Sequence, residues 1–332
     1  MPDSVTDRNE AENQETVRDQ IVVTGSLAFD HIMTFPGLFK DHILPDKLHA
    51  INISFLVDKM ERKRGGCGGN VAYSLALLGH SARLIATAGS DFSDYRDFLH
   101  ATGVDVSAIR VFDDETTASA FITTDQSDSQ IQGFYVGAMP RAAELSLQEL
   151  AGPRARVCII SPDDPRAIAR HCREARAAKL PFFFDPSFQV THMDGETLTE
   201  CAQEAEGLML NDYEFSVFEE KTGCRGDAIF DLVDMAVMTL GEKGSRILRA
   251  GKPPLEIPSA AAGKVIDPTG AGDAFRAGFL AGWSEGLELA VCGRMGSIAS
   301  VYAVEQYGTQ SHNYTRAEFD QRYVENFGAP PK

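Results

Sequence analysis

Short apolar runs alternate with longer amphipathic segments from Ile21 onward, and this order constrains the fold more than any other feature of the chain. The runs are almost continuously apolar, as is typical of strands that are buried on both faces of a parallel sheet. The segments between them have the length and periodicity of helices that cover such a sheet. We therefore predict an α/β fold of three layers, with a mainly parallel sheet in the middle.

The predicted elements follow one another in strand–helix order. Strands are predicted over residues 21–25, 83–88, 156–161, 181–185, 207–211 and 235–240. Helices are predicted over residues 69–78, 93–102, 165–179, 196–205, 212–222, 271–285 and 287–304. Ligands of such sheets bind beyond the carboxyl ends of the strands, and we expect the functional site at that edge.

Two regions interrupt this order, because their apolar and polar side chains alternate with a period of two residues. Residues 48–57 alternate apolar and polar side chains in their middle, and residues 119–124 and 130–136 flank a polar turn at 125–129. Such alternation indicates half-exposed strands instead of buried parallel ones. We therefore predict a small β sheet that projects from the main domain.

This small sheet is predicted to act as a lid. It would comprise about residues 31–62 and 116–137, inserted into one domain that spans residues 21–332. A lid excludes water from a site in which water would compete with another acceptor. The alternatives are an edge hairpin of the main sheet or a subunit interface.

Charge and cysteine content exclude several classes of function. A net charge of −17 argues against nucleic acid as a partner, because binding to a phosphate backbone needs clustered Lys and Arg. The chain has no apolar run of about 18 residues, so we expect no membrane span. Its 6 cysteines form no CxxC pair and are typical of reduced thiols in a cytoplasmic protein. Residues 1–20 are polar and acidic, which predicts a disordered tail and not a signal peptide.

Residues 267–275, Asp-Pro-Thr-Gly-Ala-Gly-Asp-Ala-Phe, carry the strongest chemical signal. A Gly-rich turn that opens a helix presents unpaired backbone N–H groups, which suit a phosphoryl group. Asp273, at the edge of this turn, could take a proton from an attacking hydroxyl. Most Gly-rich turns are merely tight turns, but the flanking carboxylates and the helix favour phosphoryl transfer to an alcohol. Walker A spacing is absent from the chain, so a P-loop enzyme is not predicted.

A second Gly-rich element, Gly-Gly-Cys-Gly-Gly-Asn, occupies residues 65–70 before a predicted helix. Asn70 offers donors and acceptors for sugar hydroxyls, and a plain helix N-cap is the alternative interpretation. Cys67 has no base beside it in the sequence, so we interpret it as a small side chain that fits the loop.

Together, residues 65–79 and 267–282 resemble the two signature motifs of the ribokinase-like (PfkB) carbohydrate kinase family, in the same order and at a similar separation. The resemblance covers essentially residues 21–308, and within the family it is closest to the bacterial adenosine kinases. Further short matches carry it: Gly-Ser-Leu-Ala-Phe-Asp-His at 25–31, Phe-Pro-Gly at 35–37, Leu-Pro-Asp at 44–46, Ser-Phe-Leu-Val-Asp at 54–58, Phe-Tyr-Val-Gly-Ala-Met at 134–139, Asp-Pro-Ser at 185–187 and Asn-Asp-Tyr-Glu at 211–214.

The resemblance implies a ribokinase-like fold and ATP-dependent phosphoryl transfer to the 5′-hydroxyl of a nucleoside, with adenosine, giving AMP, as the favoured acceptor. Asp273 would be the general base, and Gly270, Ala271 and Gly272 would form the anion hole. Asp30 would accept hydrogen bonds from two vicinal ribose hydroxyls, although a turn acid or helix cap is the alternative.

Sugar and base would be held by further residues that the resemblance implies: Ser26, Gly66 and Asn70. Phe121 and Phe134 fall in the predicted lid strands and could stack on a purine, although Phe in a β element is usually core. Gln189 could bind a base edge. Phe188 occupies the position at which the adenosine kinases carry Gln, so recognition of the base can differ at this position. Tighter stacking on the base and a broader nucleoside specificity are the two alternatives.

On the ATP side, the resemblance implies contacts from Asn211, Thr239, Gly241, Lys243 and Gly244. Lys243 could neutralise phosphate charge or be an exposed turn lysine. Glu214 would act on Mg²⁺ through water, although Glu in the first turn of a helix is favourable by itself. Asp267 would help to form a K⁺ site. The resemblance also suggests a homodimer.

Other functions remain open from the sequence. A broad-specificity nucleoside kinase or a kinase of sugars or sugar phosphates would use the same motifs, and Arg62, Lys63 and Arg64 suit a sugar phosphate. A binding module without activity would keep the fold, although the intact loop at Asp273 argues against it. An oxidoreductase is disfavoured, because residues 25–30 lack the GxGxxG pattern.

Overall fold

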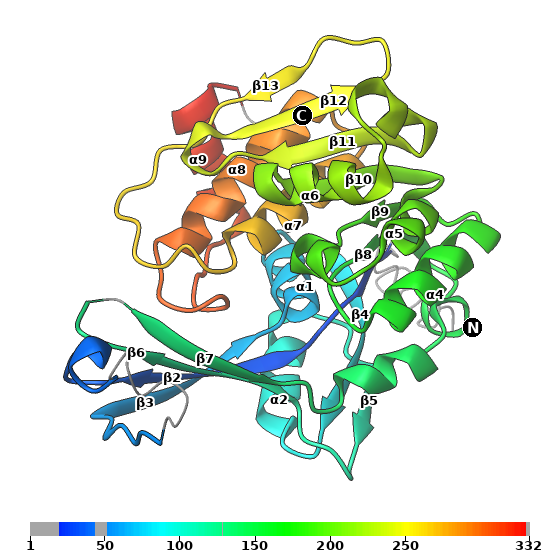
Figure 1. The fold of residues 1–332 in the computed structure, drawn as a ribbon. Helices are drawn as coiled ribbons and strands as arrows, with labels where there is room; N and C mark the ends of the chain where they lie inside the picture. The colour runs from blue at the N-terminus through cyan, green and yellow to red at the C-terminus, as the bar shows by residue number, and fades with distance from the viewer. Residues whose placement is uncertain (1–19, 44–51, 128, 330–332) are drawn as a thin grey trace, which may run out of the picture.

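A 9-stranded sheet forms the centre of the computed structural model, which describes residues 20–43, 52–127 and 129–329 (Figure 1). Its order is β13-β12-β11-β10-β9-β8-β1-β4-β5. Neighbours from β11 to β5 are parallel, whereas β12 is antiparallel to both of its neighbours, which confirms the predicted mainly parallel sheet. The strand bounds are β1 Gln20–Thr24, β4 Ser81–Gly89, β5 Ile109–Phe112, β8 Ala155–Ile160, β9 Phe182–Phe184, β10 Ala205–Asn211, β11 Val233–Thr239, β12 Ser245–Arg249 and β13 Leu255–Ile257.

Helices cover both faces of this sheet (Figure 1). Alternate residues of β1 separate two apolar cores, because Ile21 and Val23 pack under one helical layer and Val22 under the other. The first layer contains α1 Cys67–Leu77, α2 Ser93–Thr102, α7 Ala271–Ser284, α8 Leu289–Val304 and α9 Arg316–Phe327, and the second contains α3 Leu147–Leu150, α4 Pro165–Ala177, α5 Gly195–Ala202 and α6 Asp212–Thr222. Short 3-10 helices are η1 Phe39–Asp41, η3 Met139–Glu144, η4 Ser187–Thr191, η5 Gly226–Asp231 and η6 Gly241–Lys243.

A 4-stranded sheet of order β3-β2-β6-β7 projects from the main body (Figure 1). It comprises β2 Ala28–Thr34, β3 Lys59–Gly65, β6 Ala118–Thr124 and β7 Gln130–Tyr135. Residues 25–27 lead directly from the carboxyl end of β1 into β2, so the small sheet begins at the edge where ligands of such folds bind. The predicted small β sheet is therefore present, and its first segment begins earlier and ends later than the predicted 31–62.

The predicted strand at 48–57 is wrong over its described part. Residues 52–57 are not a strand, and residues 44–51 lie outside the described residues. Every second side chain of 52–57 is nonetheless partly buried. Phe55 packs against the rings of Phe35 and Phe39, with centroid separations of 4.9 Å in each case. The alternation therefore reflects packing on an aromatic cluster and not pairing in a sheet.

Other differences concern ends and short elements. Gln20 begins β1, so the predicted tail 1–20 is too long at its end, and residues 1–19 lie outside the described residues. The predictions from the sequence do not include β2, β3, β5, β12, β13, α3 or α9. For α9 a signal exists, because Thr315 and Glu318 form a capping box at its start. Within the described ranges, no helix is long and apolar enough to cross a bilayer.

Candidate active site

The N-terminus of α7 is shaped as a site for an anion. Gly270 is the N-cap residue, and its φ of 81° is a backbone conformation that side chains disfavour. Asp267 fixes the preceding turn, because its Oδ1 accepts a hydrogen bond from the Thr269 amide at 2.9 Å. The Ala271 amide donates to the Pro268 carbonyl at 3.3 Å, so the next amides of the first turn, together with the positive end of the helix dipole, are left for an anion. The predicted anion hole therefore lies at a helix end that favours negative charge.

Asp273 lies in the first turn of the same helix, beside this anion site. Its Oδ2 accepts a hydrogen bond from Asn70 Nδ2 at 2.8 Å. Burial raises the pKa of the Asp273 carboxyl, and the positive charge of Arg276 opposes that rise. A raised pKa makes an ionised carboxylate a stronger proton acceptor, so the surroundings of Asp273 suit a general base.

Asn70 joins Asp273 to distant parts of the chain. Its Oδ1 accepts a hydrogen bond from Gln310 Nε2 at 2.8 Å. Gln310 Nε2 also contacts the Tyr95 hydroxyl, which donates to the Gly65 carbonyl at 2.9 Å. Because both ends of the Asn70 amide are bonded, its orientation is fixed. Asn70 lies inside α1 and is not its N-cap residue.

Asp30 lies in β2 of the lid, next to the Gly-rich loop. A Cβ added at Gly65 would lie 2.7 Å from Asp30 Oδ2, so this carboxylate rests directly on the glycine backbone. Burial raises the pKa of Asp30 to about 6, and the negative charge of Asp267 adds to the rise. A series of contacts thus connects the two predicted carboxylates. Asp30 rests on Gly65, and hydrogen bonds lead from the Gly65 carbonyl through Tyr95, Gln310 and Asn70 to Asp273.

The register of the lid strands decides which side chains share a face with Asp30. Cross-strand partners lie on the same face of a sheet. The row that contains Asp30 continues through Ala120 to Phe134, and we name this side the inner lid face. Phe121 is instead paired with His31, with ring centroids 4.7 Å apart, on the outer lid face. The structure therefore brings Phe134 together with Asp30 but does not bring Phe121, and Ala120 takes the position between them.

Of the remaining predicted acceptor residues, Ser26 and Gln189 follow β1 and β9, and Gly66 is the N-cap residue of α1. Gly66 packs against Ser26, whose carbonyl oxygen would lie 2.6 Å from an added Cβ, so only glycine fits. Gln189 is buried, and its Nε2 donates a hydrogen bond to the Asp163 carbonyl at 2.7 Å. The neighbouring Phe188 is 48% exposed. The amide of Gln189 is therefore held by the main chain, whereas the ring of Phe188 is accessible.

A cavity of about 1020 Å³ extends from the N-terminus of α7 along the carboxyl ends of β10 and β11. The loop between β13 and α7 forms its opposite wall through Ser259, Ala260, Ala262 and Val265. Lys243 is not among the lining residues, whereas Glu242 of the same turn is. The predicted residues that the cavity brings together are Asn211, Glu214, Thr239, Gly241, Gly244, Gly270, Ala271, Gly272 and Asp273.

Asn211 and Glu214 form a capping box at the start of α6. Asn211 Oδ1 accepts from the Glu214 amide at 2.8 Å, and the Asn211 amide donates to Glu214 Oε2 at 2.9 Å. Carboxylate oxygens accept more than one hydrogen bond, so Glu214 can still hold a water of a hydrated Mg²⁺ ion. In the described part of the chain, no group of three or more His, Cys, Asp or Glu could hold a metal. A Mg²⁺ ion here would therefore rely on ligand and water oxygens.

Asp267 connects the anion-hole turn to the loop that follows α8. Its Oδ2 accepts a hydrogen bond from the Gly308 amide at 3.0 Å. Thr309 of the same loop donates through Oγ1 to the Arg64 carbonyl at 3.0 Å. A carboxylate between two loops fits one of the oxygen ligands that a K⁺ ion would need, and backbone carbonyls would have to supply the others.

Two further residues of the site, Arg276 and Asp185, were not predicted from the sequence. Arg276 Nε lies 2.6 Å from Asp185 Oδ2, and both side chains are buried. Burial raises the pKa of Asp185 to about 7, and Arg276 opposes that rise. A Cβ added at Gly272 would lie 2.6 Å from Arg276 Nη1, so the guanidinium lies beside the anion hole. The signal was available, because Arg276 follows Asp273 by three residues and shares its helix face.

Comparison with known proteins gives the family of this chain. Residues 19–316 match the family described as pfkB family carbohydrate kinase. The chain is 30% identical to the nucleoside kinase of Methanocaldococcus jannaschii over 296 residues, which cover 89% of this chain and 93% of the relative. The solved structure of that archaeal member of the ribokinase family covers 93% of this chain and 99% of its own, with a TM-score of 0.84 and 29% identity.

A bacterial structure is also similar over nearly the whole chain. The Burkholderia thailandensis nucleoside kinase in complex with inosine has a TM-score of 0.84 and 38% identity, with 94% of this chain and 99% of that chain covered. Its complex with ADP-inosine has a TM-score of 0.82 and 40% identity, with 94% and 97% covered. These likenesses confirm the predicted ribokinase-like fold. The chain belongs to the pfkB family of carbohydrate kinases.

Proposed function

We propose that this protein is an ATP-dependent kinase that transfers a phosphoryl group to the 5′-hydroxyl of a nucleoside. The position of Asp273 between two halves of the site carries the proposal. On one side, Asp273 and the anion hole line the large cavity. On the other side, the hydrogen bond from Asn70 joins Asp273 to the network that reaches Gly65, on which Asp30 rests. A base in this position meets an acceptor from the lid side and a phosphoryl donor from the cavity side.

Asp273 would take the proton of the 5′-hydroxyl as the oxygen attacks the γ-phosphorus in line. The bond from that phosphorus to the bridging oxygen breaks, ADP leaves, and the proton remains on Asp273 until solvent removes it. The amides at Gly270, Ala271 and Gly272 would stabilise the charge on the transferred group. Transfer would be direct. Among the described residues that line the cavity, Cys67 is the one thiol, and burial and the Asp273 charge raise its pKa, so it stays protonated and is a poor nucleophile.

We place ATP in the cavity, with its γ-phosphate at the N-terminus of α7. Its other phosphates and its ribose would lie near Asn211, Thr239, Gly241 and Gly244, with Lys243 at the exposed side of the turn. Mg²⁺ would neutralise charge on the phosphates, and Glu214 would hold one of its waters. K⁺ beside Asp267 would order the turn that precedes Gly270.

Purine ribonucleosides are the acceptors that the arrangement supports best. Asp30 would bind the vicinal ribose hydroxyls, and Phe134 would stack on the base. Gln189 would bind a base edge through its Oε1, because its Nε2 is hydrogen-bonded to the Asp163 carbonyl. Ala120 leaves space on the inner lid face between Asp30 and Phe134. Adenosine is favoured by the motif matches, and the relative from Burkholderia thailandensis was solved with inosine. We therefore propose a broad purine specificity that includes adenosine.

A sugar phosphate acceptor is less well supported, because two of the three cations before the Gly-rich loop are directed elsewhere. Arg62 pairs with Asp91 at 3.0 Å, and Arg64 stacks on the ring of Phe98 at 4.1 Å. The lid register places both arginines on the outer lid face, opposite Asp30. Only Lys63 of this group shares the face of Asp30.

Asp273→Asn should reduce turnover by about 10²–10⁴-fold and leave nucleoside binding intact, because only the proton acceptor is lost. ADP formation would be measured with Mg·ATP, with and without K⁺, against adenosine, inosine, guanosine, cytidine, ribose and fructose 6-phosphate. A near-normal rate in the variant would reject Asp273 as the base. Nucleoside binding without turnover in the wild type would instead identify a binding module.

Nucleoside binding should weaken as the pH falls through about 6, because Asp30, with its pKa raised to about 6, becomes protonated and accepts fewer hydrogen bonds. Between pH 7.5 and pH 5, the Kd for inosine, measured by calorimetry without ATP, should rise about tenfold. Asp30→Asn should bind more weakly and lose this dependence. A Kd that is constant across this range in the wild type would contradict the ribose assignment.

Phe134→Ala should weaken purine nucleoside binding by about tenfold, because a stacked base loses its aromatic partner. Phe121→Ala is the matched control, since Phe121 is a similarly exposed aromatic residue of the adjacent strand but lies on the outer lid face. Both would be tested by calorimetry with inosine. An equal loss in the two variants, or a loss only in Phe121→Ala, would refute the assignment of the inner lid face.

We also propose a homodimer that forms through the outer lid face. This face carries exposed apolar side chains at Met60, Phe121, Ile131 and Tyr135. Sedimentation equilibrium should give a dimer at micromolar concentration, and Ile131→Asp should shift it toward monomer because it introduces a charge into the contact. A wild-type protein that sediments as a monomer would exclude this arrangement.

A further inference from the structure

One wall of the cavity consists of a segment without regular structure. Residues 258–266, which we name the cavity loop, contain no helix or strand, and residues 261–266 are exposed. Ser259, Ala260, Ala262 and Val265 of this loop line the cavity. A loop of this kind depends on contacts from outside itself to hold one conformation.

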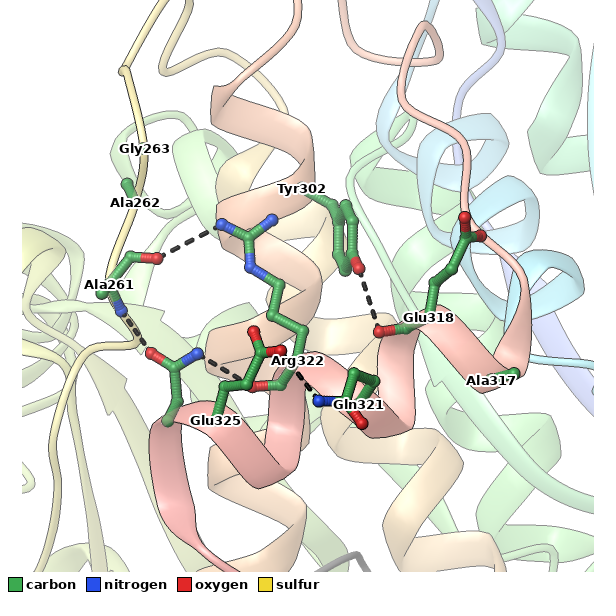
Figure 2. A pocket seen from close by; sticks show the side chains of 10 residues that line it. Ala261, Ala262, Gly263, Tyr302, Ala317, Glu318, Gln321, Arg322 and Glu325 are labelled. Carbon is green, nitrogen blue, oxygen red and sulfur yellow. Dashed lines mark hydrogen bonds between the residues drawn. The ribbon is translucent and has the colours of Figure 1, made fainter.

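Helix α9 binds both backbone groups of one residue in this loop, Ala261 (Figure 2). Asn326 Oδ1 accepts a hydrogen bond from the Ala261 amide at 2.7 Å, and Arg322 Nη2 donates to the Ala261 carbonyl at 3.2 Å. Asn326 Nδ2 also donates to the Arg322 carbonyl at 2.8 Å, one helical turn away. The two side chains therefore reach the loop from consecutive turns of the same helix.

Glu305, just after α8, extends this contact to the next part of the loop. Its Oε1 accepts a hydrogen bond from the Gly263 amide at 2.6 Å. Arg322 binds both oxygens of Glu305, at 2.6 and 2.8 Å. Paired guanidinium and carboxylate groups with two parallel bonds have a defined geometry, so Arg322 orients the acceptor that holds Gly263.

The two sides of the cavity loop face different spaces. The cleft in Figure 2 is lined by α9 side chains and by Ala261, Ala262 and Gly263. Ala262 also lines the large cavity, so the loop is a thin wall between the cleft and the cavity. Among the described residues that line the large cavity, none belongs to α9. α9 can therefore influence a ligand in the cavity only indirectly, through the loop or through α8, which packs on α9 and also lines the cavity.

We propose that Arg322 and Asn326 are positioning residues for the phosphate donor, because they hold the cavity loop where the nucleoside end of ATP contacts it. This inference rests on the proposed function, which places the γ-phosphate at Gly270. Ser259, Ala260 and Ala262 would then contact the part of ATP farthest from the reacting phosphorus. Loss of the α9 contacts should weaken ATP binding without affecting the acceptor side, which the lid and α1 form.

The test uses Asn326→Ala in the full chain. Mg·ATP binding, measured by calorimetry without nucleoside, should weaken about threefold to tenfold, as expected for one lost hydrogen bond to a backbone amide. Inosine binding should not change. Amide hydrogen exchange at Ala261 and Gly263 should become faster, because the loop is no longer held.

Two further variants separate positioning from general stability. Gln321→Ala is the matched control, because Gln321 lies on α9 in the same cleft but donates to Glu325 at 2.8 Å instead of to the loop. It should bind Mg·ATP as the wild type does. Asn326→Asp keeps an acceptor for the Ala261 amide and should recover most of the ATP binding.

The outcomes distinguish this inference from the proposed function. Wild-type affinity for Mg·ATP in Asn326→Ala, with only a lower melting temperature, would overturn the inference and leave a structural role for α9. An equal loss of Mg·ATP and inosine binding would also overturn it. A wild-type protein that binds inosine but no Mg·ATP would overturn the proposed function, and this inference with it.

Discussion

The hydrogen bond from Asn70 to Asp273 is the interaction on which the rest of the site depends. It joins α1 to α7, which come from opposite ends of the sequence and begin side by side at the carboxyl edge of the sheet. A partly buried carboxylate without partners would be costly, and the Asn70 amide and the nearby Arg276 charge offset that cost. The Asn70 amide is itself fixed by Gln310 and, through it, by Tyr95. The geometry of the proposed base therefore requires that α1, α2, α7 and the loop after α8 are all in place.

The two halves of the site are built by different means. The acceptor half combines the lid with α1, and its proposed ligand group Asp30 lies in a strand that continues from β1. The donor half lies between the ends of β10 and β11 and the cavity loop. If the small sheet acts as the predicted lid, binding of an acceptor to Asp30 would favour the lid position that excludes water. Acceptor binding would then control when phosphoryl transfer can occur, since water would be excluded from the site around ATP only when the acceptor is bound.

Local sequence signals predicted the parts of the site that are local in the structure. The turn and helix at 267–273, the helix α6 and the helix α2 depend on neighbouring residues, and the predicted bounds of α2 and α6 agree with the structure. The choice between Phe121 and Ala120 depends on the register of the lid strands, and an error of one residue exchanges the two faces. The contact between Gln310 and Asn70 joins residues that are 240 positions apart, so no periodicity could reveal it. The segment 52–57 shows the opposite error, because alternation predicted pairing where the structure has only packing.

A chain with a net charge of −17 has to bind a highly charged anion without an extended basic surface. Among the described residues that line the cavity, Arg276 is the one cation, and it is paired with Asp185. Glu214, Glu242 and Asp273 line the same space, so the side chains alone would repel ATP. Attraction must then come from backbone amides at the start of α7 and from Mg²⁺ on the phosphates. Amide dipoles act over short distances, so their effect is lost when the ligand shifts by a small amount. An acidic kinase of this kind therefore needs rigid walls more than a basic one does, which gives a physical reason for holding the cavity loop from outside by α9.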